Sequence, residues 1–142
     1  IDTESRGNAS SVQILEEADL VVVNIDQDKE DWDDYFENYA SMLEKSVFLI
    51  GRYEKENPFN LELIQKQYHI PRGKMAVIPY NIDLHIAANE GRMIPFLNRN
   101  YLKSSRAENE YLMGEVKRAV IMLKENMTYL GKPDMMRRFG KN

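Results

Sequence analysis

The side chains that most often carry out catalysis or bind metals are scarce in this sequence of 142 residues. It contains no cysteine and only two histidines, His69 and His85. Without cysteine a chain has no disulfide, no thiolate-bound metal or iron–sulfur cluster, and no cysteine nucleophile. Neither histidine has an acidic, serine or cysteine partner at a spacing that suggests a catalytic pair. We therefore expect neither histidine to be catalytic.

Acidic residues are concentrated at positions 26–37, where seven acids accompany one lysine. Their order does not follow the D-x-[DN]-x-[DN]-G pattern of a Ca²⁺-binding loop. Aromatic residues recur through the same region at helical spacing, at Trp32, Tyr35, Phe36 and Tyr39. The pattern predicts an amphipathic helix whose acids are solvated and whose aromatic side is in the core. A metal site and a partner-facing groove are the alternatives.

Composition limits the class of protein. The length suits one domain with its own hydrophobic core, and 43% of the residues are hydrophobic. A net charge of −4 excludes a chain that is basic throughout. No apolar run approaches the roughly 20 residues of a membrane helix, and no signal peptide is recognisable. We therefore expect a cytoplasmic protein, in keeping with the absence of cysteine, that makes no membrane contact.

Three uninterrupted apolar runs predict buried strands, at 20–25, 47–50 and 75–78. Runs without polar alternation suit strands that are covered on both faces. Helical patterns precede, separate and follow these strands, at 10–18, 26–43, 60–68, 83–89 and 106–126. This alternation predicts an α/β fold with a mostly parallel, doubly wound sheet and flanking helices.

Three further features complete the predicted organisation. Gly91 is expected to stop the helix that precedes it, and residues 94–105 are expected to be irregular or loosely helical because Pro95 and a serine pair interrupt them. The long helix at 106–126 should bury one face, formed by Leu112, Val116, Ala119, Val120 and Leu123. Residues 127–142 form a basic tail that is expected to be frayed and solvated.

Ligands of parallel α/β sheets bind outside the carboxyl ends of the strands. Three segments of this sequence meet that condition, at 24–28, 51–53 and 79–81, because each follows one predicted strand. These segments are the candidate binding positions.

The opening residues and the first predicted strand resemble a stretch of the MinD/ParA family of deviant P-loop ATPases. Ile1-Asp2-Thr3 is similar to the end of that family's Walker B strand, and Gly7 falls in its switch II segment. The run at 18–23, ADLVVV, resembles the next strand. The order and spacing of these features carry the resemblance, since no single motif among them is specific.

The resemblance continues downstream and covers about residues 1–125. The segment at 50–53, IGRY, stands where the family has an Asn-Arg strand end near the adenine. The segment at 77–81, VIPYN, resembles the family's "IPYD" segment, and the segment at 86–92, IAANEGR, resembles its alanine-rich helix and glycine turn.

The resemblance implies ATP and Mg²⁺ as cofactors. Asp2 would hold Mg²⁺ through a water molecule and orient the attacking water, which makes it the candidate catalytic and metal-linked carboxylate. Gly7 would leave room for a backbone N–H to approach the γ-phosphate. The remaining candidate cofactor-binding residues would lie near the base and are Gly51, Arg52, Pro79, Tyr80 and Asn81.

Several features depart from the family pattern. The G-x-x-x-x-G-K-[ST] loop and the family's signature lysine are absent, which fits a chain that starts without Met and lacks the N-terminal half of the domain. Glu4 replaces the usual proline and would repel a nucleotide, and Gly51 replaces an asparagine. These differences suggest a divergent branch, similar either to polar-localising pilus-assembly ATPases of the TadZ/CpaE type or to ParA-like proteins of conjugative elements.

The sequence thus predicts that residues 1–126 are the C-terminal portion of a ParA/MinD-like nucleotide-binding domain. The intact protein would be an ATP-switched homodimer that positions or partitions DNA, pilus or secretion machinery as cargo. The chain alone should not hydrolyse ATP, because the phosphate-binding lysine and backbone cradle are missing. Two alternatives remain: a degenerate, non-catalytic interaction module of the same fold, and a complete flavodoxin-like or receiver-like domain.

Overall fold

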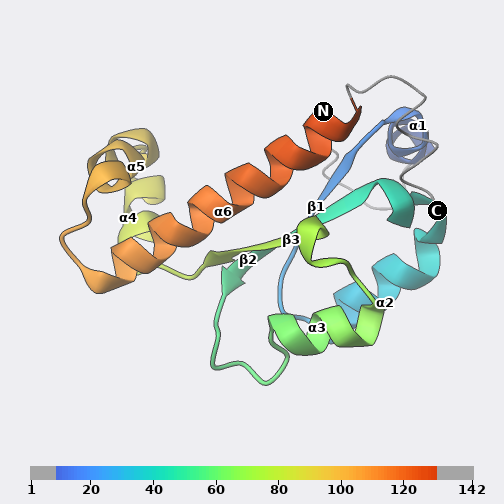
Figure 1. Ribbon diagram of the computed structural model, residues 1–142, viewed down its shortest axis with the longest axis horizontal. Coiled ribbons are helices and arrows are strands. Elements are labelled where there is room, and N and C mark those ends of the chain that lie inside the picture. The colour runs from blue at the N-terminus through green and yellow to red at the C-terminus, as the bar shows by residue number, and fades with distance from the viewer. Residues whose placement is uncertain (1–8, 131–142) are drawn as a thin grey trace.

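The computed structural model describes residues 9–130, in which three parallel strands form a sheet between helices (Figure 1). The strands β1 (Val21–Ile25), β2 (Ser46–Tyr53) and β3 (Met75–Pro79) lie side by side in that order. All three predicted strands and their parallel arrangement are confirmed. β2 continues beyond the predicted end of its apolar run, to Tyr53.

Two crossovers cover one face of the sheet. α2 (Lys29–Asn38) and the 3₁₀ turn η1 (Ala40–Lys45) lead from β1 to β2, and α3 (Leu61–Tyr68) and η2 (Arg72–Lys74) lead from β2 to β3. α6 (Ala107–Leu130) crosses the opposite face (Figure 1). The predicted α/β fold with helices on both faces is therefore confirmed, and the strand order does not reverse among the described strands.

The remaining helices flank the sheet. α1 (Ala9–Glu17) precedes β1, and α4 (Ile82–Asn89) and α5 (Met93–Leu102) follow β3 and pack against the N-terminal half of α6 (Figure 1). Within residues 9–130, no helix combines the length and apolar character that crossing a membrane requires.

The larger core lies between the sheet and the crossovers, and Trp32 is at its centre. The indole is fully buried, with ring centroids 5.1 Å from Phe48 on β2 and 5.5 Å from Tyr68 on α3. Its Nε1 donates a hydrogen bond to the Asp26 carbonyl at 2.9 Å. The prediction that the aromatic side of α2 belongs to the core is confirmed.

The acidic side of α2 behaves as a helix surface. Asp28 caps the helix, since its Oδ1 accepts a hydrogen bond from the Glu30 N–H at 2.9 Å. Asp33 pairs with Lys29 and accepts a hydrogen bond from the Tyr68 hydroxyl, and these two contacts lower the pKa of its carboxyl. No group of three or more metal-binding side chains occurs among residues 9–130.

Two predictions about the C-terminal helices were wrong in detail. α5 is a regular helix because Pro95 is its third residue, where the missing N–H would have had no partner within the helix. Val120 on α6 is 45% exposed, whereas Met113 and Met122 are buried. The buried side of α6 therefore consists of Leu112, Met113, Ala119 and Met122 and does not include Val120.

The end of α4 agrees with the sequence-based prediction, whereas the end of α6 does not. Gly91 follows α4 with a φ of 69°, the left-handed conformation expected of a glycine stop, and this prediction is confirmed. α6 extends four residues past its predicted end at Asn126 and reaches Leu130. The boundary predicted between domain and basic tail therefore falls inside a helix, and residues 131–142 lie outside the described part.

Stability should fall in alkali because Tyr35 must stay protonated in the fold. Its hydroxyl lies 2.7 Å from Ser46 Oγ, which donates its own proton to the Met42 carbonyl, so Tyr35 is the donor. Burial raises the pKa of Tyr35 above its ordinary value near 10. The pKa of Tyr35 is higher in the folded state than in the unfolded state. The stabilisation that this hydroxyl contributes is therefore complete below about pH 10 and is lost as the pH rises further.

Urea denaturation across this pH range tests the point. In Tyr35→Phe the fall in unfolding free energy above about pH 10 should be shallower by up to about 1.4 kcal/mol per pH unit. A residual slope is expected, because the pKa values of Tyr68 and Tyr111 are also raised by burial. The same slope in wild type and variant would contradict the assignment to Tyr35.

Candidate functional site

The candidate site lies at the carboxyl ends of β2 and β3. Gly51 and Arg52 belong to the last part of β2, and Pro79 ends β3. Tyr53 pairs with Pro79 in the register of the sheet, and the Tyr80 N–H donates to the Tyr53 carbonyl at 3.0 Å. The structure therefore brings together the two segments that the sequence placed near a nucleotide base. Asp2 and Gly7 lie outside the described residues.

The end of β2 is irregular where Arg52 approaches β1. The register with β3 shifts between Ile50 and Tyr53, and Arg52 has a φ of 46°, which is unusual for a residue with a side chain. Its Nη2 lies 2.6 Å from Oδ2 of Asp26, which follows β1, and this hydrogen bond raises the pKa of the guanidinium. A Cβ on Gly51 would lie 3.4 Å from the other Asp26 oxygen. That distance is an ordinary van der Waals contact, so the Asp26 carboxylate lies directly beside the strand at Gly51.

Gln27 fixes the loop that follows β2. Its Nε2 donates to the carbonyls of Glu54 and Phe59 at 3.1 and 3.0 Å, and its Oε1 accepts from the Glu54 N–H at 2.8 Å. The sequence identified positions 24–28 as a candidate segment but not the roles of Asp26 and Gln27. These side chains connect the carboxyl ends of β1 and β2.

Tyr80 and Asn81 differ sharply in environment. The Tyr80 ring is 50% exposed beside the strand ends, whereas Asn81 is buried. Asn81 Oδ1 accepts a hydrogen bond from the Leu84 N–H at 2.8 Å and so caps α4, while Nδ2 donates to Asn109 Oδ1 on α6, also at 2.8 Å. Both polar atoms of Asn81 are therefore engaged within the protein.

Asn109 continues this polar connection, and no pattern in the sequence indicated its role. It is buried, and its Nδ2 donates to Oδ2 of Asp83 at 3.0 Å. Arg106 contacts both oxygens of the same carboxylate at 3.2 Å. The start of α6 is thus attached to the start of α4, next to the candidate site.

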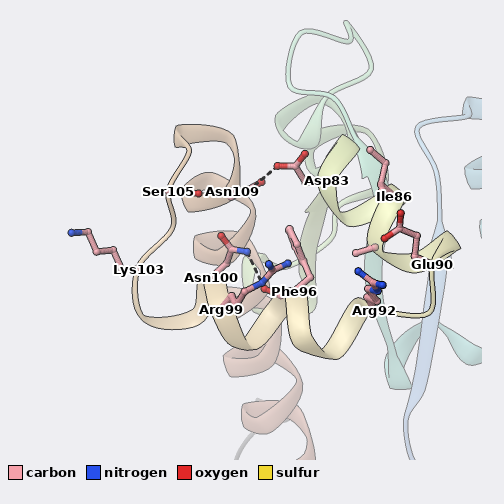
Figure 2. Close-up of a pocket in the computed structure, with 11 residues that line it drawn as sticks. Asp83, Ile86, Glu90, Arg92, Phe96, Arg99, Asn100, Lys103, Ser105 and Asn109 are labelled. Carbon is pink, nitrogen blue, oxygen red and sulfur yellow. Dashed lines mark hydrogen bonds between the residues drawn. The ribbon is translucent and has the colours of Figure 1, made fainter.

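A cleft of about 570 Å³ lies between α4, α5 and the start of α6 (Figure 2). It contains none of the predicted base-binding residues and adjoins the Asp83–Asn109 hydrogen bond. Six of its eleven lining residues are apolar or basic, namely Ile86, Ala87, Arg92, Phe96, Arg99 and Lys103, and the other five are acidic or polar, including Asp83 and Glu90. No local pattern in the sequence indicated that these residues would share a cleft.

In comparisons with protein-family models, curated proteins and solved structures, no match to this chain was found. The geometry of the strand ends is therefore the basis for assigning a function. These ends combine an exposed aromatic ring, an exposed Arg52–Asp26 ion pair and an irregular strand end. This arrangement can accept a planar group against Tyr80.

Proposed function

We propose that the chain is part of a ParA/MinD-like ATPase of the cytoplasm, a nucleotide-switched homodimer that positions DNA, pilus or secretion machinery. The observation that carries the proposal is the adjacency of Gly51–Arg52 and Pro79–Asn81 on neighbouring parallel strand ends. Ligands of such sheets bind at this edge. These segments stand where the family that the sequence resembles has its adenine-side segments, and this supports a nucleotide base at the same edge.

The described residues fit the base of ATP better than its phosphates. The exposed ring of Tyr80 offers a stacking face, and the exposed Arg52 guanidinium lies at the end of the neighbouring strand, paired with Asp26. No group of metal-binding side chains within residues 9–130 would hold Mg²⁺. The proposal assigns that ion to Asp2 and the γ-phosphate contact to Gly7. Bound ATP would supply the phosphoanhydride bond whose hydrolysis resets the dimer.

The exposed face of β1 is compatible with a larger sheet. β1 pairs only with β2 among residues 9–130, which leaves its other edge without a described strand. Val22 pairs with Val47 in register and so shares the face that α6 covers, yet Val22 is 42% exposed while Val47 is fully buried. Parallel sheets are normally covered on both faces. These features support a sheet that continues in the intact protein.

Nucleotide binding and turnover test the proposal. A preparation of residues 1–142 should show no ATP hydrolysis, whereas the full-length protein should bind and hydrolyse Mg–ATP and dimerise with it. Asp2→Ala in the full-length protein should lower turnover by at least about tenfold. Turnover by residues 1–142, or no effect of Asp2→Ala, would contradict the assigned roles.

Tyr80→Ala isolates the base-binding edge. In the full-length protein it should weaken binding of a fluorescent ATP analogue by about fivefold to tenfold, from the loss of one stacking contact. Tyr101→Ala is the matched control, because that ring is 56% exposed on α5. Equal affinities of the two variants would remove Tyr80 from the site.

A non-catalytic interaction module is the second candidate, and one observation favours it. The side chains of Arg52 and Asn81 are already engaged, by Asp26 and by Leu84 and Asn109. Side chains that already form these contacts have fewer free donors and acceptors with which to bind a ligand. Failure of the full-length protein to bind ATP would support this second candidate over the first.

A further inference from the structure

The cleft between α4 and α5 carries positive charge that the described protein does not neutralise. Arg92, Arg99 and Lys103 line it, and none of them forms an ion pair with another residue in the range 9–130. The cleft also has two acids: Asp83, which is already bound by Arg106 and by Asn109, and Glu90, so its three cations outnumber them. The region is thus locally basic in a chain whose net charge is −4.

The same cleft has an apolar wall that continues onto the surface. Phe96 and Ala87 are buried at its base, and Ile86 lines it while remaining 47% exposed. Met93 and Ile94, which follow Arg92 in the chain at the start of α5, are also exposed, Ile94 by 71%. Exposed apolar side chains beside a cleft, such as Ile86, are a feature of interaction surfaces.

The arrangement of the cations limits which of them can bind an occupant. Figure 2 shows Arg92 and Arg99 on either side of Phe96, whereas the side chain of Lys103 extends away from the cleft. An occupant seated in the cleft over Phe96 and against Ile86 would therefore meet a guanidinium on each side. Guanidinium groups bind carboxylates in a planar, two-point geometry.

We propose that this basic–apolar cleft, defined by Ile86, Arg92, Phe96 and Arg99, binds an acidic amphipathic segment of a partner protein. Apolar side chains of the segment cover Ile86, above the buried Phe96, and its carboxylates pair with the two arginines. Charge complementarity selects an acidic occupant. An open cleft of about 570 Å³ accepts a few side chains from one helical segment. The inference is independent of nucleotide binding at the strand ends.

Fluorescence anisotropy with defined peptides tests the proposal. The probe is a fluorescein-labelled helical peptide of about 18 residues, or five turns, with leucines on one face and glutamates on the other. Matched peptides carry lysine or glutamine in place of glutamate. The glutamate peptide should bind residues 1–142 at least about tenfold more tightly than the lysine peptide, and increasing salt from about 50 to 300 mM should weaken it.

Two pairs of variants locate the binding. The double variant Arg92→Glu/Arg99→Glu should lose at least about tenfold in affinity. Lys66→Glu/Lys124→Glu, on exposed positions of α3 and α6, changes the net charge equally and should lose less than about twofold. Ile86→Gln should weaken binding about fivefold, whereas Ile121→Gln at an exposed position of α6 should not.

Circular dichroism confirms that each variant is folded. Equal binding of the glutamate and lysine peptides, or equal losses in the two charge-reversal variants, would overturn the proposal. Tighter binding of duplex DNA or of anionic lipid vesicles than of the glutamate peptide would also overturn the proposal. Either result would mean that the arginines of the cleft bind phosphate groups and not the carboxylates of a protein segment.

Discussion

Replacing Trp32 with alanine is expected to lower the free energy of unfolding by about 4 kcal/mol, because it removes a large aromatic side chain from the core. The indole is fully buried between Phe48 and Tyr68, so its loss leaves a cavity between the sheet and both crossover helices. It also removes the hydrogen bond to the Asp26 carbonyl. Since a domain of this size is stable by only about 5–15 kcal/mol, much of that stability should disappear.

Urea denaturation followed by circular dichroism measures this effect, because Trp32 is the only tryptophan and cannot report on its own replacement. Trp32→Phe keeps most of the apolar volume and should cost about half as much, largely from the lost hydrogen bond and the smaller ring. Tyr101→Ala removes an exposed aromatic side chain and should cost less than about 1 kcal/mol. A cost for Trp32→Ala as small as that of Tyr101→Ala would contradict this account of the core.

Trp32 also links stability to the candidate site. The carbonyl that it binds belongs to Asp26, whose carboxylate contacts Arg52 at the end of β2. The indole therefore fixes the chain at the point where β1 leaves the sheet. The core of the fold and the geometry of the strand ends depend on the same side chain.

The features that could be predicted from the sequence are those set by local patterns. The apolar runs identified all three strands, and the aromatic spacing of α2 identified the core face of that helix. Asn60 stands at the start of the helix predicted at 60–68, and its Oδ1 accepts a hydrogen bond from the Leu63 N–H. Pro95 was misleading, because a proline interrupts a helix only beyond its first turn.

The features that could not be predicted depend on contacts between distant residues. The partner of Asn81 is Asn109, on a helix 28 residues away, and no local pattern connects the two. The same holds for Arg52 and Asp26, which meet only because β1 and β2 pair in parallel. The sequence could therefore place the candidate segments at one edge of the sheet, but not show which side chains are free there.

Asn81→Ala is expected to lower the free energy of unfolding by about 2–3 kcal/mol, because Asn81 has two structural roles. Loss of the cap on α4 should cost about 1 kcal/mol. Loss of the donor to Asn109 leaves a buried amide oxygen without that partner, which should cost a further 1–2 kcal/mol or so. The measurement is again urea denaturation followed by circular dichroism.

Two further variants separate these roles. Asn60→Ala removes a comparable cap from α3, where the side chain's hydrogen bond is to the Leu63 N–H, and should cost only about 1 kcal/mol. Asn81→Ser keeps a capping hydroxyl but is too short to reach Asn109, so its cost should fall between those of Asn60→Ala and Asn81→Ala. If Asn81→Ala cost no more than Asn60→Ala, the contact between α4 and α6 would contribute nothing. Asn81 would then be no more than a helix cap, and its amide could turn toward a ligand at little cost.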